Sequence, residues 1–302
     1  MEKKPLDLSL ILPAYNEEKS IASVIKGINE VLHGMDLSYE ILVVDDGSDD
    51  QTSEAAVDAG ARVVSHPENI GNGASIKTGI RSARGQLLLM MDADGQHPPD
   101  MIPVLLEEAK NFDMVVGART KQSDTDIHRD FGNKVYNMLA SYITGRRIED
   151  LTSGFRVIKS EIARRFIYLL PNTFSYPSTI TLAVLRSGGS LKYVPIEGKR
   201  RIGRSKIKLL RDGMRFLTII LRVATYYSPL KVFIPVSILM FLTGFGYGLY
   251  KVLVLNTRYG PTSAMLMTVS VVIFMVGLVS EQIAQLMYIW SEKNNTFEKR
   301  NE

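Results

Sequence analysis

The chain has 302 residues, of which 45% are hydrophobic and 23% charged, with a formal net charge of +4. These values are close to the average of a globular protein. There is no cysteine, which excludes disulfides, thiolate chemistry and zinc–thiolate sites, and the four histidines are scattered without ligand spacing. The first apolar run, residues 8–12, is too short for a signal-peptide core, so we expect the N-terminal region to stay in the cytoplasm.

The first 120 residues alternate between short apolar runs and segments with helical spacing. Strands are predicted at residues 8–12, 39–44, 61–66, 86–91 and 112–119, and helices at about 17–32, 51–59, 73–84 and 101–111. Strands that alternate with helices imply crossover connections. The predicted fold class is therefore α/β, with a mainly parallel sheet covered on both faces.

Polar residues follow four of these predicted strands. They are Tyr15, Asn16 and Glu17 after the first strand, Asp45 and Asp46 after the second, Asp92, Asp94 and Gln96 after the fourth, and Arg119 at the end of the fifth. Ligands of such sheets gather at the carboxyl ends of the strands. We therefore expect the functional crevice at this edge.

Residues 130–200 have a less regular pattern. They include predicted helices near 131–144 and at 160–170, a loop "EDLTSGFR" and a strand at 191–196. Ten Lys or Arg residues then follow between Lys199 and Lys231, against the single acid Asp212. Residues 208–227 are amphipathic, which is typical of a helix lying at a membrane surface.

Two long uncharged stretches follow the basic segment. Residues 232–250 and 263–280, the second extended toward Trp290, each approach the roughly 20 helical residues needed to cross a bilayer. The basic flanks, 199–231 and 292–300, place both outer ends in the cytoplasm by the positive-inside rule. The alternative is a pair of core helices of a soluble protein.

The segment "DADGQHPP" at residues 92–99 has the chemistry of a metal site. Asp92, Asp94 and Gln96 are spaced by two, which puts their side chains on one side of an extended segment. Three hard oxygen donors suit Mg²⁺ or Mn²⁺, and such an ion stabilises a departing nucleotide diphosphate. The alternative is a solvated acidic turn that caps the next helix.

Three segments occur in order, each after an apolar strand: "LPAYNEE" at 12–18, "VVDDGSDDQT" at 43–52 and "DADGQHPP" at 92–99. Together they resemble the family-2 inverting glycosyltransferases of the GT-A fold, especially the membrane-anchored dolichol- and polyprenyl-phosphate hexose synthases. The resemblance covers residues 8 to about 210. It implies an enzyme that binds a nucleotide-sugar donor and a lipid phosphate acceptor.

The resemblance also implies roles for individual residues. The nucleotide-sugar would be contacted by Pro13, Tyr15, Glu17, Val44, Asp46, Asp92, Ala93, Asp94 and Gln96. Of these, Asp92, Asp94 and Gln96 would hold the metal ion. Arg119 and Arg129 would face the acceptor phosphate, and Arg200 and Lys206 would belong to a basic loop that closes over the phosphates.

Asp150, in "DLTSGFR", matches the family's segment beside the sugar, and with Asp94 and Arg119 it completes the candidate catalytic set. The alternatives for Asp150 are a helix cap or a salt bridge. A phosphate monoester has its second pKa near 6, so the acceptor is already largely a dianion at neutral pH and a general base is dispensable. For Arg200 and Lys206 the alternative is attraction to anionic lipid headgroups.

Two departures from the family limit this transfer of roles. Many relatives have an acid in the region of "FSYPSTITLAV", where this chain has only Ser, Thr and Tyr176. The Gln-x-x-Arg-Trp motif of the processive polysaccharide synthases is also absent, because the single tryptophan, Trp290, lacks the preceding arginine. A processive polymerase is therefore disfavoured.

The predicted organisation is a cytoplasmic GT-A domain (1–207), a juxtamembrane amphipathic helix (208–230), two transmembrane helices (231–291) and a cytoplasmic tail (292–302). The predicted reaction moves one hexose, with inversion, from a GDP- or UDP-sugar to a polyprenyl or dolichyl phosphate at the bilayer. The alternatives are another lipid acceptor, a nucleotidyltransferase, or a membrane-anchored binding protein without catalysis. No nucleic-acid partner is expected. Glycines at 244, 246 and 248 are compatible with close packing of the spans, within the chain or in a homo-oligomer.

Overall fold

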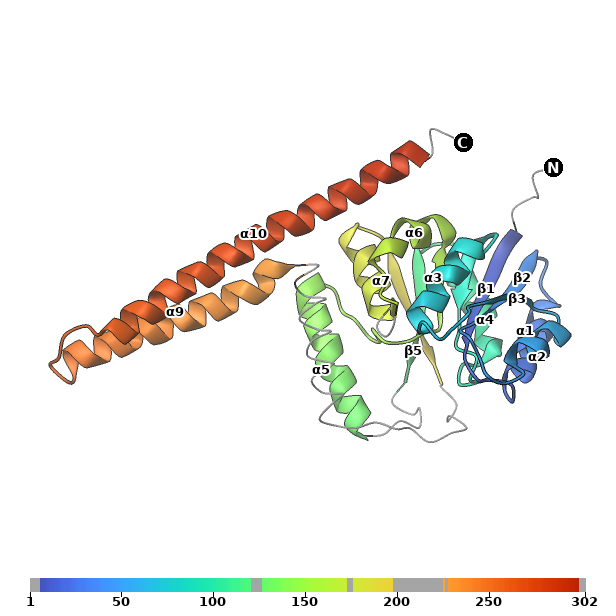
Figure 1. Cartoon of the computed structure of the whole chain (residues 1–302), viewed down its shortest axis with the longest axis horizontal. Coiled ribbons are helices and arrows are strands. Elements are labelled where there is room, and N and C mark those ends of the chain that lie inside the picture. Colours follow the sequence, from blue (N-terminus) through green and yellow to red (C-terminus); the bar gives the residue numbers. More distant parts are fainter. Residues whose placement is uncertain (1–5, 121–126, 173–175, 198–224, 226–227, 299–302) are drawn as a thin grey trace. The chain divides into compact units, whose positions relative to one another are not determined.

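A computed structural model describes residues 6–120, 127–172, 176–197, 225 and 228–298; of these, 127–133, 135 and 288–298 are described by their backbone alone. The chain divides into two compact units, Met1–Lys208 and Leu209–Glu302. The first contains the sheet and the second the two long apolar helices (Figure 1). The predicted amphipathic helix over 208–227 falls outside the described residues, except for Thr225.

The first unit is built on a seven-stranded sheet. Its strands are β1 (Leu6–Ala14), β2 (Tyr39–Asp45), β3 (Arg62–Ser65), β4 (Gly85–Met90), β5 (Met114–Arg119), β6 (Arg156–Lys159) and β7 (Leu191–Ile196). Their order across the sheet is β3-β2-β1-β4-β6-β5-β7. All pair in parallel except β6, which is antiparallel to β4 and β5. The expected mainly parallel sheet is confirmed, whereas Arg156, assigned to a loop, begins a strand.

Helices cover both faces of the sheet (Figure 1). They are α1 (Ile21–Leu32), α2 (Thr52–Asp58), α3 (Asn72–Ser82), α4 (Ile102–Glu108), α5 (Ile127–Thr144), α6 (Ser160–Arg165) and α7 (Tyr176–Arg186), with 3₁₀ turns η1 (Pro99–Met101) and η2 (Ile167–Leu169). Successive side chains of a strand point to opposite faces. Leu10 and Leu12 accordingly join the layer under α1 and α4, while Ile11 packs against Gly79 of α3.

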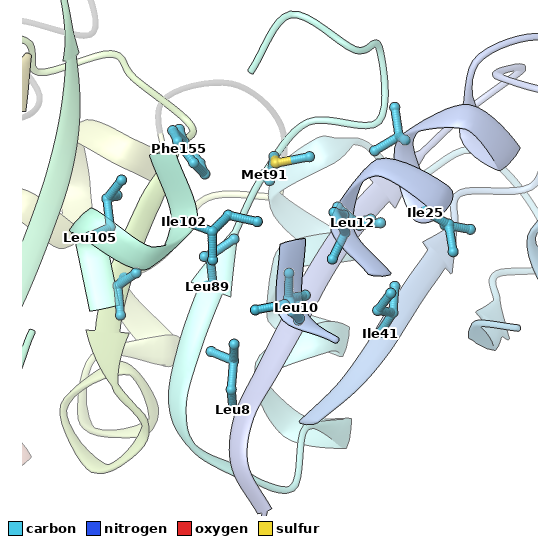
Figure 2. Close-up of a cluster of buried hydrophobic side chains, with 14 of the residues drawn as sticks. Leu8, Leu10, Leu12, Ile25, Ile41, Leu89, Met91, Ile102, Leu105 and Phe155 are labelled. Carbon is cyan, nitrogen blue, oxygen red and sulfur yellow. The ribbon is translucent and has the colours of Figure 1, made fainter. Parts of the chain in front are cut away.

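The layer between the sheet and helices α1 and α4 is the main core (Figure 2). Leu10 and Leu12 of β1, together with Leu89 of β4, have at most 1% of their surface exposed. Figure 2 shows Met91 and Phe155 in this layer, Met91 just after β4 and Phe155 just before β6. The last apolar residues before the acidic segment are therefore fixed by core packing, and the segment itself starts from a rigid position.

The antiparallel β6 determines which loop reaches the functional edge. Six strands end at this edge, but β6 begins there, with Arg156 in register with Met90 of β4 and Val116 of β5. The segment 150–155, which leads into β6, therefore lies between the ends of β4 and β5. The topology brings Asp150 and Gly154 next to the residues that follow those two strands.

The second unit is an antiparallel hairpin of α9 (Pro229–Leu253) and α10 (Pro261–Glu298). Segments Pro229–Leu253 and Pro261–Met287 are long and apolar enough to cross a membrane, in agreement with the two predicted spans. A Cβ added at Gly244 would lie 2.8 Å from the Leu266 Cβ, and one added at Gly277 would lie 2.6 Å from the Phe233 Cβ. The two helices are in close contact because these positions have no side chain.

Candidate active site

The loop after β1 is hydrogen-bonded to the loop after β2. Asn16 has a left-handed backbone (φ 56°), which asparagine tolerates better than most residues. Its side-chain oxygen accepts a hydrogen bond from the Asp49 backbone N–H (2.9 Å), and its own N–H donates to the Ser48 hydroxyl (2.9 Å). The Glu17 N–H donates to the Thr52 hydroxyl (2.8 Å). With these bonds in place α1 begins at Ile21, four residues after the predicted start. The Tyr15 side chain is 43% exposed.

Asp46 is buried and holds the segment between β3 and α3. Its carboxylate accepts hydrogen bonds from the backbone N–H groups of Ile70 (3.1 Å) and Gly71 (2.7 Å). The His66 Nδ1 lies 2.7 Å from the same carboxylate, and the His66 Nε2 lies 2.8 Å from the Thr78 hydroxyl. Both carboxylate oxygens thus have partners within the chain, and contact of Asp46 with a nucleoside stays a prediction.

Asp92 follows β4 at the carboxyl edge of the sheet, where the sequence places a metal ligand. Its side chain is 38% exposed, and one oxygen lies 3.4 Å from the His97 Nε2. Burial alone would raise the pKa of Asp92, but hydrogen bonds with His97 and Asn72 and the charges of His97 and Arg119 outweigh it and lower this pKa. Asp92 is therefore a carboxylate at neutral pH.

Asp94 and Gln96 form a tight turn after Asp92. The Asp94 carboxylate accepts a hydrogen bond from the Gln96 backbone N–H (3.1 Å), and both side chains are half-buried. Within the described part of the chain, no group of three or more His, Cys, Asp or Glu side chains is placed to hold a metal ion. The predicted set has only two such side chains, together with the amide of Gln96. One or two carboxylates are what Mg²⁺ usually takes from a protein when substrate phosphates complete its shell, so the donor chemistry fits.

Arg119 and Asp150 form a bidentate ion pair between β5 and the segment before β6. The Arg119 Nε and Nη2 lie 2.8 and 3.0 Å from the two Asp150 oxygens, and Nη2 also donates to the Thr152 hydroxyl (2.6 Å). The Asp150 carboxylate also accepts hydrogen bonds from the backbone N–H groups of Thr152 and Ser153, both 3.1 Å. Burial opposes ionisation, but the hydrogen bonds and charge of Arg119 lower the pKa of Asp150. Of the alternatives, the salt bridge is the arrangement observed.

Arg156, which sequence patterns did not single out, is fully buried beneath the site. Its Nε donates to the Ser153 carbonyl (3.1 Å), and its Nη1 donates to the Pro177 carbonyl (2.8 Å) and the Thr181 hydroxyl (3.0 Å). The guanidinium also lies 5.9 Å from the centre of the Tyr176 ring. Arg156 therefore ties the segment before β6 to α7, and an arginine inside an apolar "FRVI" run is the signal that could have revealed it.

The remaining predicted residues differ in accessibility. Pro13, Val44 and Ala93 are buried. Arg129 lies in α5, where only the backbone is described, and Arg200 and Lys206 lie outside the described residues. The structure thus brings Asp92 and the Arg119–Asp150 pair to one edge of the sheet. The roles of these and of the other predicted residues stay predictions.

The Asp150 pKa has a consequence for stability at acidic pH. Because folding lowers this pKa below its ordinary value of 3.8, the ion pair stabilises the fold fully above that pH and loses its contribution as the pH falls through the folded-state pKa. Denaturant unfolding of the wild-type protein and of Asp150→Asn should show a constant difference between pH 7 and about pH 5, which shrinks below about pH 4. A difference that persists unchanged into acid would contradict this.

The model of glycosyl transferase family 2 matches residues 9–168 of the chain, more than half of its length. The chain belongs to glycosyl transferase family 2. A second family model, the GtrB C-terminal hairpin, matches residues 228–286, which form the α9–α10 hairpin. The family suggested by the three sequence segments is therefore confirmed, together with a C-terminal hairpin of two long apolar helices.

Two relatives are similar to this chain over two thirds of its length or more. The chain is 31% identical over 217 residues to the dolichol-phosphate mannosyltransferase of Pyrococcus furiosus, covering 67% of this chain and 60% of that protein. It is 28% identical over 269 residues to an undecaprenyl-phosphate 4-deoxy-4-formamido-L-arabinose transferase of Klebsiella pneumoniae, covering 84% of this chain and 78% of that protein.

The fold of this family-2 chain also occurs in solved structures. Glucosyl-3-phosphoglycerate synthase from Mycobacterium tuberculosis, in complex with Mn²⁺ and uridine-diphosphate-glucose, superposes with a TM-score of 0.56 at 22% identity, covering 72% of this chain and 77% of that one. At this identity the likeness concerns the fold. It confirms the expected GT-A architecture.

Proposed function

We propose that the protein transfers a single hexose from a nucleotide-sugar to a polyprenyl phosphate at the cytoplasmic face of a membrane, with inversion at the anomeric carbon. One observation carries this proposal: in a family-2 chain that also contains an apolar hairpin, the carboxylate of Asp92 stands partly exposed at the sheet edge to which β5 also brings the Arg119–Asp150 pair. Relatives named for sugar transfer to undecaprenyl and dolichol phosphates support the acceptor class.

In this proposal Asp92, Asp94 and Gln96 would hold a Mg²⁺ or Mn²⁺ ion, which when bound would supply positive charge to the diphosphate of the donor. A neighbour of the same fold solved with Mn²⁺ and uridine-diphosphate-glucose supports this kind of ion. We assign the nucleoside to Pro13, Tyr15, Glu17, Val44 and Asp46. Arg129, Arg200 and Lys206 are assigned to the phosphates on sequence alone.

The acceptor phosphate is the nucleophile. One of its oxygens forms a bond to the anomeric carbon while the bond from that carbon to the diphosphate oxygen breaks, and the nucleoside diphosphate leaves. Since the phosphate monoester is already largely a dianion at neutral pH, no residue has to remove a proton. This agrees with Asp150, whose lowered pKa and hydrogen bonds make it a weak base.

Asp150 instead orients Arg119. The bidentate pair fixes the guanidinium plane at the end of β5, and Thr152 adds a third contact. A cation held in this way attracts an anionic group that enters the crevice without having to reorganise. We therefore assign Arg119 to the acceptor phosphate and give Asp150 a positioning role.

The test is one panel of reactions with the purified full chain. Radiolabelled UDP- and GDP-hexoses are supplied with Mg²⁺ or Mn²⁺, with and without polyprenyl phosphate. Labelled lipid that forms only when polyprenyl phosphate is present, with inverted anomeric configuration by NMR, is the expected result. Formation of nucleoside triphosphate from the nucleotide-sugar and pyrophosphate would identify a nucleotidyltransferase. Binding of a donor without any product would identify a non-catalytic protein.

A further inference from the structure

We propose that His97 and Gly154 are positioning residues for Asp92: together they fix the orientation of the carboxylate that takes the divalent ion. The inference rests on the proposed function, because it concerns the same ion, but it assigns roles to two residues outside the predicted ligand set. Two contacts with Asp92 carry it, and the anchoring of the segment that makes the second contact supports it.

The first contact is made by His97. This side chain is only 8% exposed, and its Nε2 lies 3.4 Å from the Asp92 Oδ2. An ionised carboxylate can only accept hydrogen bonds, so the ring donates from Nε2. The orientation of the imidazole is itself constrained by Phe155, whose ring stacks on it with centroids 5.1 Å apart and planes inclined by 19°. The imidazole is therefore held by the core and holds Asp92 in turn.

The second contact is the close approach of Gly154, which has no side chain, to the Asp92 carboxylate. A Cβ at this position would lie 2.9 Å from the Asp92 Oδ2 and 3.2 Å from Oδ1. Its φ lies outside the left-handed region, so the backbone itself does not call for glycine. The carboxylate occupies the space that a Cβ would need, so a side chain here would displace it, and the main chain of Gly154 lies against one side of Asp92.

The supporting observation is that the main chain around Gly154 is anchored by hydrogen bonds. Arg156 is fully buried and donates to the Ser153 carbonyl, directly before Gly154, and to the Pro177 carbonyl at the start of α7. The Tyr176 hydroxyl adds a hydrogen bond to the Gly154 carbonyl (3.4 Å). The main chain of Gly154 therefore cannot move away from Asp92 without disturbing α7. Substitution of residues that orient a metal ligand without touching the ion typically lowers metal affinity 10- to 100-fold.

The experiment measures Mn²⁺ binding by the full chain in detergent, from the EPR signal of free Mn²⁺, with Mn²⁺ alone and with UDP or GDP added. His97→Phe keeps a ring to stack on Phe155 but removes the donor, and should weaken Mn²⁺ binding about tenfold. His97→Gln restores a donor at a similar reach and should recover most of the affinity. Gly154→Ala should also weaken binding about tenfold, because the new methyl group displaces the carboxylate.

Gly34→Ala is the matched control, since a Cβ there meets nothing within 4 Å and the backbone is not left-handed. It should leave Mn²⁺ binding unchanged. The thermal midpoint of each metal-free variant is measured in parallel, and the proposal requires affinity to fall in His97→Phe while that midpoint stays within a few degrees of wild type. Gly154→Ala is subject to the same requirement.

The outcomes separate this inference from the proposed function. Wild-type affinity in both His97→Phe and Gly154→Ala, together with its loss in Asp92→Asn, would overturn the inference and leave the metal site intact. If His97→Gln is as weak as His97→Phe, the hydrogen bond is not what matters and the inference also fails. Unchanged binding in Asp92→Asn, or no binding by wild type under any of these conditions, would instead contradict the metal site itself.

Discussion

Replacing Asp92 and Asp94 together by asparagine should lower kcat by at least about a thousandfold, even at saturating Mg²⁺ and Mn²⁺. The reason is that the two carboxyl groups that follow β4 are the proposed ligands, and asparagine lacks the preference of a carboxylate for a divalent cation. Loss of a single preorganised group that stabilises developing charge already costs about 10²- to 10³-fold. The measurement is the initial rate of transfer to polyprenyl phosphate over a range of metal concentrations.

The control for this double variant is Asp58→Asn, a change of the same kind at an exposed residue of α2, which should transfer sugar at the wild-type rate. A double variant with near wild-type activity at high metal would remove the ion from the mechanism. The two single variants compare the ligands: if Asp92 is the better-oriented ligand, Asp92→Asn should lower the rate of transfer more than Asp94→Asn does.

Asp150→Ala should lower the free energy of unfolding by about 3 kcal/mol. Removal of one partner from a buried ion pair leaves the other charge buried and uncompensated, which costs about 3–5 kcal/mol. We expect the lower end because the Arg119 side chain retains 20% of its exposure. The substitution also leaves the backbone N–H groups of Thr152 and Ser153 without their acceptor. Denaturant unfolding at pH 7 measures the change.

The matched control is Glu107→Ala, which breaks the ion pair of Glu107 with Lys110 on the surface of the same unit. Both side chains of that pair are about two-thirds exposed or more, and such pairs contribute at most about 1 kcal/mol. Equal losses in Asp150→Ala and Glu107→Ala would contradict the positioning role of Asp150. A pH–rate profile of the wild type that requires a base with the pKa of a perturbed carboxyl would contradict it as well.

Much of the sheet was predictable because several of its strands contain a continuous apolar run. Strand 39–44 agrees with the structure to within a residue at each end, and its residues from Ile41 onward are buried. Strand 191–196 agrees as well, although it lies at the edge of the sheet with Lys192 and Pro195 exposed. The four-residue β6 was missed because it starts with a charged residue and pairs only with strands distant in the sequence. Propensity within so short a window contains no signal for that pairing.

The candidate site was predictable where it depends on strand ends and unpredictable where it depends on β6. The position of Asp92 follows from the length of the apolar run before it. The pairing of Arg119 with Asp150, and the contact of Gly154 with Asp92, depend on the antiparallel insertion of β6 between β4 and β5, which no local pattern indicates. Similarly, α7 is buried on nearly all sides despite its Ser and Thr residues. The Thr181 hydroxyl, for example, accepts a hydrogen bond from Arg156 and donates one to the Pro177 carbonyl.

The central claim, that oxygen ligands at the end of β4 hold the divalent ion, is tested most directly by anomalous diffraction at the manganese edge. Crystals of the full chain are grown with Mn²⁺ and a nucleoside diphosphate. The account predicts one strong anomalous peak within coordination distance of the Asp92 and Asp94 carboxylates and of the diphosphate. A peak bound by other residues, with these carboxylates turned toward bulk water, would contradict it.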